Sequence, residues 1–212
     1  NQCSASPLYA VIDLGSNSFH MLITRLIADG VQTVDKVKRK VRIASGLDEN
    51  NVLFEQAIQR GLECLSFFAE RLQDIPFDNV RIVATATLRL AKNGQTFIER
   101  ANKVLGQNIT LLSGEQEAEL IYLGVAHTSC CEEKRFVIDI GGASTELIVG
   151  SNLTPKKIYS LDMGCVTYNR QFFADGLLTV NNFNQAIAAA KQALTPLIAP
   201  YTLIGWQSVL GG

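Results

Sequence analysis

Two short segments of the chain, residues 13–20 and 139–146, align without a gap and share an aspartate, a glycine and a serine at matching positions. Each begins with an aspartate at the end of an apolar run, passes through glycine and serine, and returns to an apolar run. The pattern is typical of a strand, a tight turn and a returning strand. Small residues leave backbone N–H groups uncovered, so such turns can bind anions such as phosphate. The aspartate beside each turn is a candidate to position a divalent cation or a water molecule.

Repetition makes this signal more specific than one glycine-containing turn, because such turns are common in ordinary hairpins. The second copy follows the first by 126 residues, from Asp13 to Asp139, which is the length of a subdomain. This spacing indicates a duplicated half-fold and not a short tandem repeat. We therefore expect the two turns to hold phosphate between them. The predicted phosphate-binding residues are Gly15, Ser16, Asn17, Ser18, Gly141, Gly142, Ala143 and Ser144.

Together with residues 84–89 and 113–118, the two turns form four motifs that resemble the exopolyphosphatase and guanosine pentaphosphate phosphatase family, in the family's order. The resemblance runs from about residue 8 to the last residue. Residues 84–90, residues 124–128 and Ala143 are more similar to the guanosine pentaphosphate branch. The family belongs with actin, sugar kinases and heat-shock chaperones. The resemblance implies an α/β fold of two ribonuclease H-like, actin-like ATPase subdomains around a cleft.

The resemblance also assigns roles to two residues outside the turns. Glu117 corresponds to the family's catalytic glutamate and would act as a general base. A structural role stays open, because residues 113–116 fit a capping box and acids in the first turn of a helix are favoured by its dipole. Arg89 corresponds to an arginine that contacts substrate phosphate, and its alternative is a surface arginine at a helix start. With Asp139 and Asp13, these residues complete the expected catalytic set.

A metal site is expected at the second turn. Asp139 and Glu146 lie seven residues apart across the predicted hairpin, so both carboxylates could reach one hard cation, with Asp13 facing them from the other turn. The resemblance implies Mg2+ as the cofactor. Glu146 has an alternative as a solvated residue of the strand.

Composition favours a globular protein. The 212 residues are 47% hydrophobic and 18% charged, enough to bury a sizeable core, and the net charge of -1 offers no general attraction to nucleic acid or membrane. No apolar stretch approaches the ~20 residues that span a bilayer, and the polar N-terminus is too short for a signal peptide. We therefore expect a cytoplasmic protein that binds neither nucleic acid nor membranes.

Hydrophobic periodicity and turn residues divide the chain into a tail (1–7), a first subdomain (8–127), a crossover (128–134) and a partial second subdomain (135–212). The family pattern would continue beyond Gly212, so the second subdomain is expected to be incomplete. The predicted strands are 8–13, 19–27, 31–43, 80–85, 109–112, 135–140, 145–149, 156–161 and 208–210. The predicted helices are 54–72, 96–105, 115–126, 166–173 and 180–198.

The sequence thus predicts a phosphohydrolase that uses a glutamate-activated water and Mg2+. The implied substrate is a phosphate-rich small molecule: guanosine pentaphosphate, an alarmone of the stringent response, or the end of inorganic polyphosphate. A homodimer is possible in the full-length protein. Two other classes share the fold, namely a kinase or ATPase, and a sensor domain that binds an alarmone without cleaving it.

Overall fold

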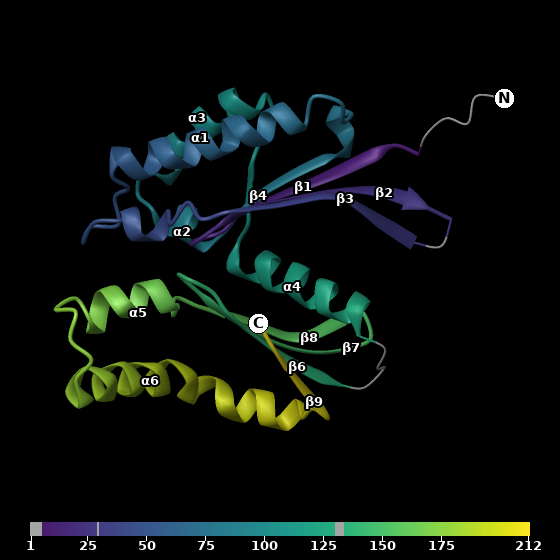
Figure 1. The fold of residues 1–212 in the computed structure, drawn as a ribbon. Coiled ribbons are helices and arrows are strands. Elements are labelled where there is room, and N and C mark those ends of the chain that lie inside the picture. The colour runs from purple at the N-terminus through teal and green to yellow at the C-terminus, as the bar shows by residue number, and fades with distance from the viewer. Residues whose placement is uncertain (1–5, 29, 130–133) are drawn as a thin grey trace. The chain divides into compact units, whose positions relative to one another are not determined.

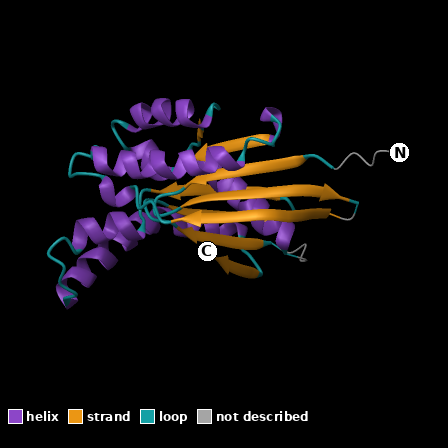
Figure 2. Ribbon diagram, turned by 45° about the horizontal axis from the view of Figure 1, so that its top comes forward, coloured by secondary structure: helices purple, strands orange, loops and turns teal. Residues whose placement is uncertain are grey.

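The computed structural model describes residues 6–28, 30–129 and 134–212. Its contacts divide the chain into two compact units, the first ending at Leu112 and the second beginning at Ser113. Each unit is a β-sheet with helices packed on it (Figure 1 and Figure 2). Most of the predicted tail, Asp29 of the turn after the second strand, and most of the predicted crossover lie outside the described residues.

Unit 1 contains a five-stranded sheet in the order β3-β2-β1-β4-β5. A hairpin joins β1 to β2, and β4 lies parallel to β1 on its other side. This arrangement places the first glycine-serine turn at the end of β1, beside the end of β4. The strands are β1 (Leu8–Leu14), β2 (Phe19–Ile27), β3 (Gly30–Arg39), β4 (Val80–Ala84) and β5 (Thr110–Leu111).

The helices of unit 1 cover one face of this sheet (Figure 1). They are α1 (Glu55–Arg71), α2 (Ala86–Leu90) and α3 (Gly94–Leu105), with short 3-10 turns η1 (Ala44–Gly46) and η2 (Phe77–Asn79). Phe97 of α3 is fully buried; its ring packs edge-on against Phe19 of β2, with centroids 6.4 Å apart. A Cβ on Gly61 of α1 would lie 2.7 Å from the Phe97 ring. Phe97 therefore ties α3 to both the sheet and α1.

Unit 2 contains a four-stranded sheet in the order β8-β7-β6-β9. Its helix α4 (Gly114–Thr128) packs on one face with Val137 and Ile148, and α6 (Val180–Ile204) packs on the other with Leu147 and Val149 (Figure 1). Successive residues of a strand point to opposite faces, so β7 is buried on both sides. The remaining elements are β6 (Arg135–Ile140), β7 (Thr145–Ser151), β8 (Thr154–Leu161), α5 (Cys165–Phe172) and β9 (Ser208–Gly211).

The compact units do not divide at the boundary predicted from sequence. Residues 8–127 were expected to form the first subdomain, but α4 packs against the second sheet through Ala118, Tyr122 and Ala126. The Tyr122 hydroxyl also donates a hydrogen bond to the Asn152 carbonyl, at 3.2 Å. The apolar face of α4 was visible in the sequence, but which sheet would bury it was not.

Three local differences from the predicted elements have physical explanations. β3 ends at Arg39 because Arg42 adopts a left-handed conformation (φ 53°). The N–H groups of Arg42 and Ala44 then donate hydrogen bonds to carbonyl groups of the first turn.

α6 continues through Pro200 because the Tyr201 hydroxyl donates to the Leu147 carbonyl at 2.7 Å, which anchors the last turn of the helix. α2 spans only five residues, too few for a detectable period. The other predicted strands and helices are confirmed to within a few residues.

No helix in the described part of the chain combines the length and apolar character that crossing a bilayer requires.

Candidate functional site

The second turn joins β6 to β7 and has a defined backbone geometry. The Gly141 N–H donates to the Ser144 carbonyl at 2.9 Å, which closes the turn. Within the described chain, no hydrogen bond uses the N–H of Gly142 or Ala143. Adjacent N–H groups in a tight turn can bind an anion, and phosphate binding by this turn stays a prediction.

The start of α5 closes against this turn. The N–H groups of Cys165 and Val166 donate to the carbonyls of Gly141 and Gly142, at 3.0 and 2.8 Å. Gly164 immediately precedes the helix, and a Cβ there would lie 2.4 Å from the Gly142 carbonyl carbon and oxygen. Only glycine fits at this position, so Gly164 sets the shape of the turn although the sequence analysis did not single it out.

We expect Gly164→Ala to lower the free energy of unfolding of unit 2 by about 1–3 kcal/mol, because a side chain pressed against backbone atoms must displace them. Phosphate binding should also weaken, because the displaced backbone atoms belong to the second turn. Gly124→Ala is the matched control in the same unit, because a Cβ there meets open space on α4 and alanine favours a helix. Denaturant unfolding of both variants checks this, and equal stability of the two would contradict it.

Asp139 and Glu146 are direct partners across the β6–β7 hairpin, so their side chains share one face of the sheet. Glu146 is 1% exposed, which excludes the solvated role considered for it, and its Oε1 accepts a hydrogen bond from Ser160 Oγ of β8 at 2.8 Å. Burial raises the pKa of Asp139 above its ordinary value. Two acidic side chains therefore share one face of the sheet in a partly dehydrated environment, where a bound cation would favour their ionised forms.

The first turn presents its groups differently. Ser16 and Ser18 are both buried; Ser16 Oγ accepts a hydrogen bond from Thr87 of α2 at 2.7 Å, and Ser18 Oγ is enclosed without a partner among the described residues. These hydroxyl groups are turned inward, so the backbone N–H groups of the turn are the better candidates to bind phosphate. Asn17 is exposed.

Asp13 occupies the position of Asp139 in the first repeat, but its partner across the hairpin is His20 instead of a glutamate. The two side chains approach to 3.7 Å, and each is a little less than half exposed. Burial, opposed by Asp13, lowers the pKa of His20. At neutral pH this pair therefore carries one negative charge where the second repeat carries two carboxylates, so the predicted metal ligands are paired only in unit 2.

Glu117 lies in the first turn of α4 and is half-buried. Ser113 and Gln116 form the capping box: Ser113 Oγ accepts from the Gln116 N–H at 3.1 Å, and Gln116 Oε1 accepts from the Ser113 N–H at 2.9 Å. The cap therefore needs neither Glu115 nor Glu117. The capping box expected over residues 113–116 is confirmed, with Gln116 in the reciprocal position.

Arg89 lies at the end of α2 and is partly buried, so it is not the freely exposed arginine considered as its alternative. Its Nη1 donates to the Leu112 carbonyl at 2.8 Å, directly before the Ser113 cap. The guanidinium is thus held at the last residue of unit 1.

The structure brings together some of the predicted site residues. Asp139 and Glu146 are paired within unit 2, which also contains Glu117. Asp13 and Arg89 belong to unit 1. The sequence analysis missed Thr87, Ser160 and Gly164; Thr87 lay within a motif already noted. Ser160 lies opposite Glu146 through the register of β7 and β8, which strand alternation by itself does not give. No group of three or more histidine, cysteine, aspartate or glutamate residues in the described chain could hold a metal.

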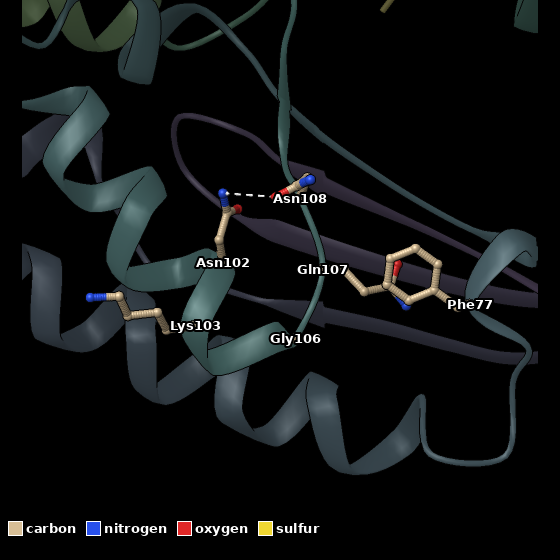
Figure 3. Close-up of a pocket in the computed structure, with 6 residues that line it drawn as sticks. All are labelled: Phe77, Asn102, Lys103, Gly106, Gln107 and Asn108. Atoms are coloured by element: carbon tan, nitrogen blue, oxygen red, sulfur yellow. Dashed lines mark hydrogen bonds between the residues drawn. The ribbon is translucent and has the colours of Figure 1, made fainter.

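A separate hollow of about 330 Å³ lies between η2 and the loop that joins α3 to β5 (Figure 3). Asn102 Oδ1 accepts from the Ile109 N–H at 2.9 Å, and its Nδ2 donates to Asn108 Oδ1 at 3.5 Å. These bonds fix the loop, which is a structural role. None of the predicted site residues line this hollow; its lining residues are Phe77, Asn102, Lys103, Gly106, Gln107 and Asn108.

Comparison with known proteins gives consistent matches. The model of the Ppx/GppA phosphatase family matches residues 22–212. A protein of Aliivibrio fischeri named guanosine-5'-triphosphate,3'-diphosphate pyrophosphatase is 58% identical over 206 residues, which is 97% of this chain and 41% of that protein. A protein of the same name from Vibrio cholerae is 58% identical over 211 residues, which is 100% of this chain and 42% of that protein. The chain thus spans less than half of these relatives.

Among solved structures, an exopolyphosphatase from Cytophaga hutchinsonii is similar to this chain with a TM-score of 0.86 and 26% identity. The match covers 96% of this chain and 66% of that one. Both units therefore have counterparts in a known structure.

Proposed function

Because the chain belongs to the Ppx/GppA phosphatase family, we propose that it carries the phosphate-binding and hydrolytic groups of an enzyme that cleaves the terminal phosphoanhydride of guanosine pentaphosphate. The fold is the duplicated, actin-like α/β fold expected from the sequence. Polyphosphate is the second candidate substrate, since the similar solved structure is an exopolyphosphatase. The 58% identity to relatives named for the guanosine substrate favours the first.

The observation that carries this proposal is the buried carboxylate pair beside the second turn. Burying the Glu146 carboxylate and half-burying its hairpin partner Asp139 costs hydration free energy, which is also why the pKa of Asp139 is raised. Neutral residues at these two positions would make the hairpin more stable. The pair is explained if it serves a positively charged ligand, and it lies directly beside N–H groups that can bind phosphate.

In the proposed reaction, the turn N–H groups bind oxygens of the terminal phosphate and Arg89 offsets their charge. A water attacks the terminal phosphorus and transfers a proton to the Glu117 carboxylate. The bond from that phosphorus to the bridging oxygen breaks, and the oxygen leaves with the shortened nucleotide. The protein's main contribution is to align the water and the phosphate, since phosphoryl transfer needs little covalent help.

Asp139 and Glu146 fit Mg2+, which favours carboxylate ligands, keeps several waters and takes its remaining ligands from substrate phosphates. Two protein ligands are sufficient for such a site. When bound there, Mg2+ would neutralise charge on the phosphate oxygens.

We expect Mg2+ to stabilise the protein, by about 2.7 kcal/mol at a hundred times its Kd.

Burial raises the pKa of Asp139 in the folded state, so the ionised carboxylate opposes folding above that pKa. This free-energy cost disappears as the pH falls below the ordinary range for aspartate. Asp139→Asn should therefore melt at a higher temperature than the parent near pH 7 without metal, and the difference should shrink toward pH 4. The variant should not respond to Mg2+. Thermal melts across this range check both effects, and an equal Mg2+ response in parent and variant would contradict the metal assignment.

The rate of phosphate release distinguishes the two candidate substrates. We expect this chain, assayed in parallel with the full-length Aliivibrio fischeri relative, to release phosphate from guanosine pentaphosphate faster than from polyphosphate, and only with Mg2+. Faster release from polyphosphate would reverse the substrate assignment.

The same assay tests the two rival functions. A kinase would need an acceptor, so turnover of a nucleoside triphosphate that depends on added sugar would favour it. A sensor domain would bind guanosine pentaphosphate without releasing phosphate, and Glu117→Gln would then change nothing.

A further inference from the structure

The backbone of Arg42, in the segment that follows β3, is left-handed, with φ 53°. A residue with a side chain loses free energy in this conformation and glycine does not, because the Cβ comes too close to a carbonyl oxygen. The other described residues with positive φ are glycines and the asparagines Asn51 and Asn152, which adopt it more readily. Arg42 is thus the outlier among the described residues, and outliers of this kind cluster at ligand sites.

Hydrogen bonds place this residue against the first turn. The Arg42 N–H donates to the Asn17 carbonyl at 2.8 Å, and the Ala44 N–H donates to the Ser16 carbonyl at 3.0 Å. Within the described chain, no hydrogen bond uses the N–H of Ser16 or Asn17. The segment therefore occupies carbonyl groups of the turn, which would repel phosphate, and leaves N–H groups available to bind it.

Contacts on both sides of Arg42 hold its backbone in place. Val41 and Ile43 are buried in the core of unit 1. The Arg42 carbonyl accepts hydrogen bonds from Ser45 Oγ at 2.8 Å and from Arg60 Nη2 of α1 at 3.4 Å. Because the backbone is already ordered, only the side chain of Arg42 has to lose freedom when it binds a ligand.

The Arg42 side chain is exposed, and in the described chain its guanidinium makes no hydrogen bond or ion pair. By contrast, Arg60 bonds carbonyl groups and Arg71 pairs with Asp35. A guanidinium offers several donors in a fork that fits two oxygens of one phosphate. An unused fork beside available N–H groups is suited to bind an anion.

General attraction by positive charge is the alternative explanation for the cations of this region. Lys36, Lys38 and Lys40 precede Arg42 and are exposed. An exposed lysine attracts an anion from any nearby position, so it needs no particular backbone conformation. The left-handed backbone and the hydrogen bond to the first turn distinguish Arg42 from these lysines.

We propose that Arg42 is a further substrate-binding residue, and that its guanidinium binds oxygens of a phosphate group held by the N–H groups of the first turn. The inference rests on the proposed function for the identity of the ligand, a chain of linked phosphates. Arg42 supplies a positive charge that the turn itself lacks, because Asn17 is neutral and the hydroxyl groups of Ser16 and Ser18 are turned inward.

The test measures the dissociation constant of inorganic tripolyphosphate by isothermal titration calorimetry at a fixed Mg2+ concentration. The Glu117→Gln chain serves as the parent, so that the ligand is not consumed. Arg42→Gly in this parent should weaken binding by about 10- to 100-fold, because charge-assisted hydrogen bonds are lost. Its melting temperature should equal or exceed that of the parent, because glycine adopts the left-handed backbone without strain and keeps the N–H and carbonyl of this position.

Two further variants of the same parent identify the cause of the loss. Lys40→Gln removes an exposed positive charge two residues away, and it should weaken binding by less than about threefold because salt screens exposed charges. Arg42→Lys keeps the positive charge but loses the fork, so its affinity should lie between those of the parent and Arg42→Gly.

Three results would overturn the inference. In the first, Arg42→Gly binds tripolyphosphate as tightly as the parent, or neither chain binds it. In the second, Lys40→Gln and Arg42→Gly lose equal affinity, which would make the effect one of general charge. In the third, Arg42→Gly melts at a lower temperature than the parent, which would mean that the side chain supports the fold of the segment.

Failure of the proposed function gives a different result. In that case the chain with Glu117 intact releases no phosphate from guanosine pentaphosphate, whereas Arg42→Gly still weakens the binding of tripolyphosphate. The inference that Arg42 binds phosphate would then stand without the hydrolytic reaction.

Discussion

Glu117→Gln should lower phosphate release from guanosine pentaphosphate by about 10²- to 10⁴-fold, the usual contribution of a general base. Glutamine has nearly the same shape as glutamate but cannot accept the proton of the attacking water. The start of α4 should not change, because Ser113 and Gln116 cap the helix. The fold and the affinity for a non-hydrolysable analogue should therefore be preserved.

Glu115→Gln is the matched control for this prediction. Glu115 lies in the same first turn, carries the same charge toward the helix dipole and is exposed. Its replacement should leave phosphate release unchanged. Equal losses in the two variants would mean that the charge of the first turn matters and that Glu117 has no special role. The measurement is made on this chain and, at the aligned glutamates, on the full-length Aliivibrio fischeri relative.

Glu146→Gln should weaken the apparent affinity for Mg2+ by more than about 100-fold, since loss of a ligand should exceed the 10- to 100-fold effect typical of groups that only orient a ligand. The amide oxygen of the new side chain can still accept the hydrogen bond from Ser160. The variant should remain folded, because glutamine keeps the shape of the side chain and the hydrogen bond from Ser160. Phosphate release at low Mg2+ should fall steeply and recover in part as Mg2+ is raised.

Ser160→Ala distinguishes the charge of Glu146 from the orientation of its carboxylate. It removes the hydrogen bond to Glu146 and leaves both carboxylates in place, so the affinity for Mg2+ should fall only about 10-fold. Mg2+ titrations of phosphate release and of thermal stability measure both variants. An unchanged Mg2+ dependence in Glu146→Gln would mean that the carboxylate pair does not hold the metal.

The regular elements followed from the sequence because their signals are local. The hairpins at both turns need small residues at fixed places, and α1 buries Ile58, Leu65 and Phe68 at helical spacing. The family was also recognisable, because four motifs retain their order. The short helix α2 was missed because five residues show no period, and the last turn of α6 was missed because it depends on a contact with Leu147, far away in the chain.

The candidate site also combines features that local sequence predicts with features that depend on distant contacts. Glycine and serine spacing identified both turns, and the roles of Glu117, Arg89 and the turn residues stay predictions. The inward orientation of Ser16 and Ser18 depends on packing against the rest of unit 1, including α2. The requirement for glycine at 164 arises because α5 approaches Gly142, a contact between positions that are not neighbours in sequence.

By itself, the sequence determined that this is a duplicated α/β chain of the Ppx/GppA family with two similar turns of small residues, because turn chemistry and hydrophobic period are properties of neighbouring residues. Only the tertiary structure decided that α4 packs on the second sheet. It also decided that Glu146 is buried against Ser160 while its counterpart His20 is not, and that Arg42 is held beside the first turn. These outcomes depend on which surfaces meet when the strands pair, and strand pairing joins residues whose separation no local pattern encodes.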